Sequence, residues 1–183
     1  MTEWNRKRNT MHHYNQLDTV YDRQYADEQK TKIEATLENV SLNNDDFVLD
    51  VGCGTGLLSS YIASRVQLFI GIDISRKLVE KAKACEKRYP NTHILLADAD
   101  YLPFQNQIFH RIFAITLLQN IPKPPTTLQE IKRVSKNHAA IAVTFLKKKF
   151  TRKAFTTALK NAKLEISVLK TDNNLKDYIA ICS

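Results

Sequence analysis

Three glycines at alternate positions make one stretch of this chain well suited to hold a ligand. The apolar run 46–51 favours a strand, Gly52, Gly54 and Gly56 come at its end, and residues 56–65 then favour a helix. Glycines let the backbone approach a ligand closely, and a helix start offers unpaired N–H groups at the positive end of the helix dipole. We therefore expect a binding site for a polar or anionic group at the end of this strand.

Acidic residues mark the ends of the next two apolar runs. Asp73 ends the run 67–73, and Asp98 ends the run 93–98. Ligands of open parallel sheets bind at the carboxyl ends of the strands, where an acid after the second strand can accept hydrogen bonds from a ribose. A dinucleotide fingerprint would place its third glycine at position 57, but the chain has Leu57 there. This disfavours a nicotinamide-dependent oxidoreductase.

Short apolar runs alternate with segments of helical periodicity along the chain. Further strands are expected at 110–116, 139–145, 164–169 and 177–181, and helices at 18–40, 126–135 and 151–162, with another capped by Ser75. This order predicts an α/β protein whose parallel sheet is covered on both faces, with the final two strands antiparallel to each other. Residues 1–20 show no clear apolar period, so we expect them to form a loose arm.

Composition bounds the class of protein. The 183 residues are 43% hydrophobic and 25% charged, which is ordinary for a globular protein. We expect a single domain over 1–183, with an N-terminal arm and helix in 1–45 and the core in 46–183. The sequence shows neither a membrane span nor a secretory signal. Its three cysteines are too few and too scattered for a disulfide framework or a metal site, so we expect reduced thiols and a cytoplasmic location.

Positive charge gathers near the C-terminus of the chain. The net charge is +8, and the basic region 147–170 contains eight Lys or Arg residues and one acid, Glu165. Such a surface often binds nucleic acid. A solvated lysine-rich face is the alternative explanation.

Four motifs, in order and at matching spacing over about residues 45–145, resemble those of class I S-adenosylmethionine-dependent methyltransferases. Segment 49–56 (LDVGCGTG) resembles motif I, and 71–75 (GIDIS) resembles motif II. Ala97-Asp98-Ala99 followed by Leu102-Pro103-Phe104 resembles motif III. Segments 111–118 and 128–134 are similar to the motif IV strand and helix of the methyltransferase type 11 group. The resemblance implies a Rossmann-like, seven-stranded, mostly parallel sheet with helices on both faces and the last strand antiparallel.

The resemblance also implies S-adenosyl-L-methionine as the cofactor. Asp73 would accept the ribose hydroxyls, Asp98 and Ala99 would bind the adenine, and Asp50 would orient the amino end. Ile74 and Leu118 would line the adenine pocket, and Tyr14 and Tyr21 resemble the N-terminal arm of the group. The complete expected cofactor set is Tyr14, Tyr21, Asp50, Gly52, Cys53, Gly54, Gly56, Asp73, Ile74, Asp98, Ala99, Thr116 and Leu118.

The methyl acceptor is left open by these motifs. An Asn/Asp-Pro-Pro-aromatic stretch is usual in enzymes that methylate amino groups, but here residues 118–122 are LQNIP. A catalytic base is not identified, although His12 or His13 in the arm could close over the site. RNA, bound through residues 147–170, is one acceptor class, and a protein or a small molecule is another. A non-catalytic subunit of the same fold is also an alternative, and an activating protein partner is expected from the small size of the chain.

Overall fold

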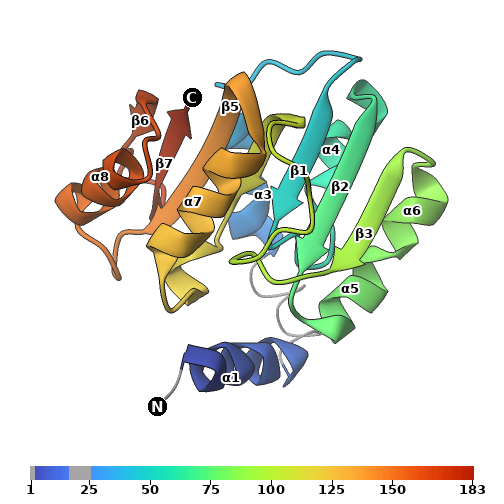
Figure 1. The fold of residues 1–183 in the computed structure, drawn as a ribbon, viewed down its shortest axis with the longest axis horizontal. Helices are drawn as coiled ribbons and strands as arrows, with labels where there is room; N and C mark the ends of the chain where they lie inside the picture. Colours follow the sequence, from blue (N-terminus) through green and yellow to red (C-terminus); the bar gives the residue numbers. More distant parts are fainter. Residues whose placement is uncertain (1–2, 17–25) are drawn as a thin grey trace.

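The computed structural model describes residues 3–16 and 26–183, and its centre is a seven-stranded sheet in the order β3-β2-β1-β4-β5-β7-β6 (Figure 1). The strands are β1 (Phe47–Val51), β2 (Leu68–Asp73), β3 (Thr92–Leu96), β4 (Phe109–Ala114), β5 (Ser135–Leu146), β6 (Ile166–Lys170) and β7 (Asp177–Cys182). The α-helices are α1 (Glu3–Gln16), α3 (Ala26–Leu37), α4 (Ser59–Ile62), α5 (Arg76–Ala82), α6 (Ala84–Arg88), α7 (Pro124–Val134) and α8 (Arg152–Asn161). Two short 3₁₀ helices are η1 (Ala63–Arg65) and η2 (Leu118–Asn120).

The sheet is parallel except at one end. β1 pairs in parallel with β2 and β4, while β7 runs antiparallel to both of its neighbours, β5 and β6. β1 is buried along nearly its whole length, as its continuous apolar run requires. The expected seven-stranded, mostly parallel sheet with an antiparallel last strand is therefore confirmed.

Helices cover both faces of the sheet, and each face has its own apolar core. One core joins α7 and α8 to the sheet through residues such as Leu128 and Phe155. The other joins α3, α4 and α5 to the sheet through Ile33, Ile62 and Val79. Because both faces are buried, the polar groups that can meet a ligand are concentrated at the strand ends.

The N-terminal segment differs from the expected loose arm. Residues Glu3–Gln16 form α1, which lies across the end of the sheet toward which β1, β2 and β3 point (Figure 1). Its mean hydropathy is low, so an apolar pattern could not reveal it. Contacts with the sheet edge, described below, hold it instead. The described part of the helix expected over 18–40 begins at Ala26.

Local chemistry explains two other boundaries. Gly56 has a φ of +82°, which is incompatible with helix, so α4 begins only at Ser59 and is four residues long. The loop backbone, rather than a long helix dipole, is therefore the main polar feature there. By contrast, Ser75 caps α5 as expected, because its side chain accepts a hydrogen bond from the Leu78 amide.

Across residues 3–16 and 26–183, no helix combines the length and apolar character needed to cross a bilayer. The same residues contain no group of three or more His, Cys, Asp or Glu side chains placed to hold a metal ion.

Candidate functional site

The glycine loop after β1 is built around close backbone contacts. The amides of Gly52 and Cys53 both donate to the Ile72 carbonyl, at 2.8 and 2.9 Å. A Cβ added to Gly52 would lie 2.7 Å from the Leu117 side chain, and one added to Gly56 would lie 2.9 Å from the Cys85 sulfur. Gly54 has a φ of +56° and no atom within 4 Å of such a Cβ. The open side of Gly54 is therefore where a ligand can approach the backbone.

Asp73 closes this loop from the end of β2. Its carboxylate accepts hydrogen bonds from the Gly54 amide at 3.0 Å and from the Ser75 amide at 2.8 Å. Burial raises the pKa of Asp73, and the backbone amides of Ser75, Gly54 and Ile74 oppose that rise. Asp73 thus both shapes the loop and presents a carboxylate to the space beside it.

A cavity beside Asp73, which we call the Asp73 cavity, collects most of the expected cofactor residues. Its lining includes the expected residues Gly52, Gly54, Asp73, Ile74, Asp98, Ala99 and Thr116. It also includes residues that were not expected, among them Lys7, Thr10, Ile115, Leu117, Asn120 and Ile121. Carboxylates facing an apolar wall suit a nucleoside, whose hydroxyl and amino groups donate hydrogen bonds while its base packs against side chains.

A second cavity, the Asp50 cavity, adjoins the first. Its lining residues are Gln29, Ile33, Asp50, Gly52, Cys53, Gly54, Thr55, Leu57, Leu58 and Ile115, of which Gly52, Gly54 and Ile115 also line the Asp73 cavity. Asp50 is only 4% exposed. Burial, with a contribution from the charge of Asp73, raises the pKa of Asp50 to about 8.

The environment of Asp50 suits a cationic group. Among the side chains that the structure describes, no Lys, Arg or His forms an ion pair with its carboxylate. A buried carboxylate without a counter-ion is costly, and a ligand ammonium in the Asp50 cavity would offset that cost. The two joined cavities therefore fit a ligand with a nucleoside at one end and a positive charge toward the other.

Lys7 brings α1 into the site, which sequence reasoning did not anticipate. Its ammonium contacts both oxygens of Asp98, at 2.9 and 2.7 Å, and forms an ion pair with Asp100. The Lys7 side chain is 7% exposed. Burial alone would lower the pKa of Lys7, but hydrogen bonds to Asp100 and Asp98 raise it. The carboxylate expected to bind an adenine amino group is thus already bound by a cation of α1.

The remaining expected site residues that the structure describes do not line the Asp73 cavity. Leu118 is completely buried in the core and is not among the residues that line the two cavities, where Leu117 takes that position. Cys53 lines the Asp50 cavity, while Gly56 packs against Cys85 and Ala82. The side chain of Tyr14 and the whole of Tyr21 lie outside the described residues.

The histidines do not form a catalytic group in the described residues. His12 is exposed on α1, and the side chain of His13 lies outside the described part. His110 accepts a hydrogen bond from the Phe47 amide at 2.9 Å, at the start of β1 and so at the edge away from the cavities. No general base is therefore assigned.

Comparison with known proteins identifies the class. Residues 49–143, more than half of the chain, match the family described as methyltransferase domain, and the chain belongs to this family. The malonyl-[acyl-carrier protein] O-methyltransferase of Marinomonas sp. is 32% identical over 132 residues, which are 71% of this chain and 48% of that protein. The chain spans about half the length of the curated relatives it matches.

Solved structures show the same fold. A chain of the complex formed with the Haloferax volcanii Trm112 methyltransferase activator has a TM-score of 0.80 at 15% identity, over 92% of this chain and 96% of that one. A SAM-dependent methyltransferase from Aquifex aeolicus has a TM-score of 0.74 at 19% identity, over 94% and 97% of the two chains. Family and fold together imply S-adenosylmethionine as the cofactor, and the joined cavities fit its two ends.

Proposed function

We propose that this chain transfers a methyl group from S-adenosylmethionine to a nucleophilic acceptor at the carboxyl edge of its sheet. The observation that carries the proposal is the pair of joined cavities, one with Asp73 and Asp98 and the other with Asp50. Asp73 would accept the ribose hydroxyls, and Asp50 would bind the ammonium of the amino-acid end. The amides of the glycine loop would lie between these two ends.

Methyl transfer from a sulfonium depends more on the positioning of the two reactants than on acid or base groups. The bound cofactor supplies a methyl group on a positive sulfur, so that a neutral thioether leaves when the acceptor takes the methyl carbon. Holding two reactants in line can supply a large part of such an acceleration. The residues around Gly52, Gly54 and Ile115 would do this by fixing the sulfur where the two cavities meet. An acceptor that must lose a proton would need a base in addition.

We infer that the acceptor is RNA, because exposed cations gather after β5, at the carboxyl edge of the sheet, and one of them contacts a loop that lines the Asp73 cavity. Lys148, Lys149, Arg152 and Lys153 are exposed at the end of β5 and the start of α8. The Lys149 ammonium also donates to the Gln119 carbonyl at 3.1 Å, next to Asn120, which lines the Asp73 cavity. A phosphate backbone bound by these cations would bring a nucleotide to the site entrance.

Lys147 was expected to belong to the basic surface, but in the structure it binds backbone carbonyls of the protein itself. Its ammonium donates to the backbone carbonyls of Asp172 at 2.5 Å, Leu175 at 2.7 Å and Thr171 at 3.3 Å. It also lies over the Tyr178 ring. These contacts hold the loop before β7, so we assign Lys147 to the fold and leave it out of the proposed RNA surface.

Replacing Lys148, Lys149, Arg152 and Lys153 together with glutamine is expected to weaken RNA binding about tenfold or more at 0.1 M salt. The slope of log affinity against log salt should fall by about 0.7 for each phosphate that the variant no longer neutralises. Fluorescence anisotropy with labelled single-stranded RNA over a salt series measures both quantities. The matched control replaces four exposed cations near β2 and β3, at the other side edge of the sheet, namely Arg65, Lys83, Lys87 and Arg88. Equal binding by the two variants would contradict the assignment.

The acceptor class itself is tested by transfer of a labelled methyl group. The chain is incubated with methyl-labelled S-adenosylmethionine and a cell lysate separated into RNA, protein and small molecules. Label in RNA supports the proposal. Label in protein, or in a carrier-bound or free small molecule, would favour the alternative suggested by the acyl-carrier substrate named for the Marinomonas relative.

We also propose an activating protein partner and a reducing compartment such as the cytoplasm. The edge strand β3 leaves Leu95 and Leu96 exposed, with Tyr101 shortly after it, and a partner could cover them. The structural neighbour bound to Trm112 supports such an arrangement. All three cysteines are free, and burial raises the pKa of Cys53 well above its ordinary value. A purified chain that is active and monodisperse alone in gel filtration with light scattering would contradict the need for a partner.

A further inference from the structure

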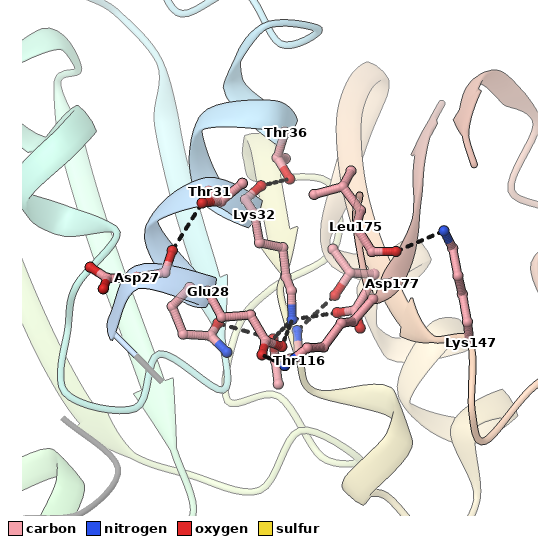
Figure 2. Close-up of polar contacts among 12 residues, drawn as sticks. Asp27, Glu28, Thr31, Lys32, Thr36, Thr116, Lys147, Leu175 and Asp177 are labelled. Atoms are coloured by element: carbon pink, nitrogen blue, oxygen red, sulfur yellow. Dashed lines mark hydrogen bonds and ion pairs between the residues drawn. The ribbon is translucent and has the colours of Figure 1, made fainter. Parts of the chain in front are cut away.

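A buried cation lies at the same edge of the sheet, outside the expected cofactor residues. Figure 2 shows the Lys32 side chain running from α3 to a group formed by Thr116, Asp177 and Glu28. Lys32 is 2% exposed and Asp177 is fully buried. Asp177 begins β7 and pairs with Leu146, the last residue of β5, so it lies at the carboxyl edge of the parallel strands.

The Lys32 ammonium has three polar neighbours. It forms an ion pair with Asp177, donates to Thr116 Oγ1 at 2.8 Å, and lies 3.7 Å from Glu28 Oε1. Burying such a pair costs several kcal/mol for each ion, and apolar side chains of similar size are often at least as stabilising. Stability alone therefore gives no reason for a buried lysine here. We look instead to the side chains that Lys32 orients.

The charge of Lys32 fixes the first step in a chain of hydrogen bonds. An ammonium only donates, so Thr116 Oγ1 must accept from Lys32. The Thr116 hydroxyl then donates its own proton to Gln29 Oε1, 3.0 Å away. With Oε1 turned toward Thr116, the Nε2 group of Gln29 is left as the donor.

Thr116 is held firmly in this arrangement. Its φ is +61°, which is a strained backbone conformation for a β-branched residue. Its amide donates to Thr144 Oγ1 at 2.8 Å, and its hydroxyl is fixed by Lys32 and Gln29. Thr116 lines the Asp73 cavity and Gln29 lines the Asp50 cavity, so their hydrogen bond joins the walls of the two.

We propose that Lys32 is a positioning residue that, through Thr116, presents the Gln29 amide as a hydrogen-bond donor to a carboxylate in the Asp50 cavity. The inference rests on the proposed function and deepens it. The amino-acid end of the cofactor carries both an ammonium and a carboxylate. Asp50 would bind the first and Gln29 the second, so the Asp50 cavity would recognise a zwitterion.

The test compares two nucleosides that differ in this end alone. S-adenosylhomocysteine has the amino acid, whereas 5′-methylthioadenosine lacks it. By calorimetry, Thr116→Val is expected to weaken S-adenosylhomocysteine binding about tenfold to a hundredfold, as for loss of a hydrogen bond to a charged group. Thr116 also lines the Asp73 cavity, so methylthioadenosine binding should weaken too, but much less than S-adenosylhomocysteine binding. Thr116→Ser, which keeps the hydroxyl, should restore the affinity.

Lys32 is tested by replacing it with its ion-pair partner Asp177 either kept or neutralised. Because Lys32→Met alone leaves Asp177 buried without a counter-ion, it is measured beside the double variant Lys32→Met/Asp177→Asn. Both are expected to lose affinity for S-adenosylhomocysteine selectively. Lys30→Met is the matched control, since Lys30 lies on the same helix and its pair with Glu34, at 4.0 Å, is exposed; it should change neither affinity.

The possible outcomes separate this inference from the proposed function. Unchanged affinities, or equal losses for both nucleosides in the double variant and in Thr116→Val, would overturn the role of Lys32 while leaving the cofactor site intact. Wild-type protein that binds neither nucleoside would instead contradict the proposed function, and this inference with it.

Discussion

Asp73→Ala is expected to lower the affinity for S-adenosylmethionine at least about a hundredfold. The carboxylate would accept the ribose hydroxyls, and hydrogen bonds to a charged acceptor contribute roughly 1.5–3 kcal/mol each. The substitution also releases the Gly54 amide, which Asp73 holds at 3.0 Å. Calorimetric titration measures the loss directly.

The fold should survive this substitution, which makes the affinity interpretable. Ser75 caps α5 with its own side chain, so the helix does not depend on Asp73 for its start. Removing a buried carboxylate whose pKa is raised by burial also removes an unfavourable charge. Glu80→Ala, on the exposed surface of α5, is the matched control and should bind like the wild type. An Asp73→Ala variant that melts normally and binds normally would exclude Asp73 from the site.

Asp50→Asn is expected to remove a pH dependence of stability. The pKa of Asp50 is about 8 in the folded chain and about 3.9 in an unfolded one. Between these values the folded state keeps a proton that the unfolded state releases. The wild type therefore loses stability relative to the variant as pH rises from about 4 to about 8, by at most about 1.4 kcal/mol per pH unit. Above about pH 8 the difference should stay constant.

Urea unfolding of both proteins at pH 5 and pH 8 checks this expectation. The free energy of unfolding of Asp50→Asn minus that of the wild type should be larger at pH 8. Comparing the two proteins at each pH cancels the titration of groups that do not interact with Asp50. A difference that is the same at both values would show that Asp50 is ionised throughout the range.

The same residue predicts a proton effect on ligand binding. An ammonium held by Asp50 favours the ionised carboxylate, so binding at pH 7 should release a proton. Calorimetry in two buffers of different ionisation enthalpy should therefore give different apparent heats for the wild type. Asp50→Asn should give equal heats and a weaker affinity.

Local pattern was enough to predict the centre of the fold and much of the site. Gly52, Gly54 and Asp73 were found because a buried strand, a glycine turn and a strand-end acid each involve a few neighbouring residues. Because β1 and β2 are parallel neighbours, the sheet brings these residues to the same edge. Their cofactor roles remain predictions.

Contacts between distant segments were not predictable in this way. Nothing near Lys7 indicates that it meets Asp98, and nothing near Lys32 indicates that it meets Asp177, because both pairs form only once α1 and α3 dock on the finished sheet. Leu117 directly precedes the short helix η2 and Leu118 is its first residue, so the difference between a cavity-lining and a core position is a single step along the chain. A helix as polar as α1 leaves no apolar period to detect.

The joined Asp73 and Asp50 cavities are expected to bind S-adenosylmethionine. Calorimetric titration of the wild-type chain with S-adenosylmethionine and, separately, with NADH tests it most directly. One molecule of S-adenosylmethionine should bind per chain, and NADH should produce no saturable heat. Saturable binding of NADH, or no binding of S-adenosylmethionine, would contradict the account.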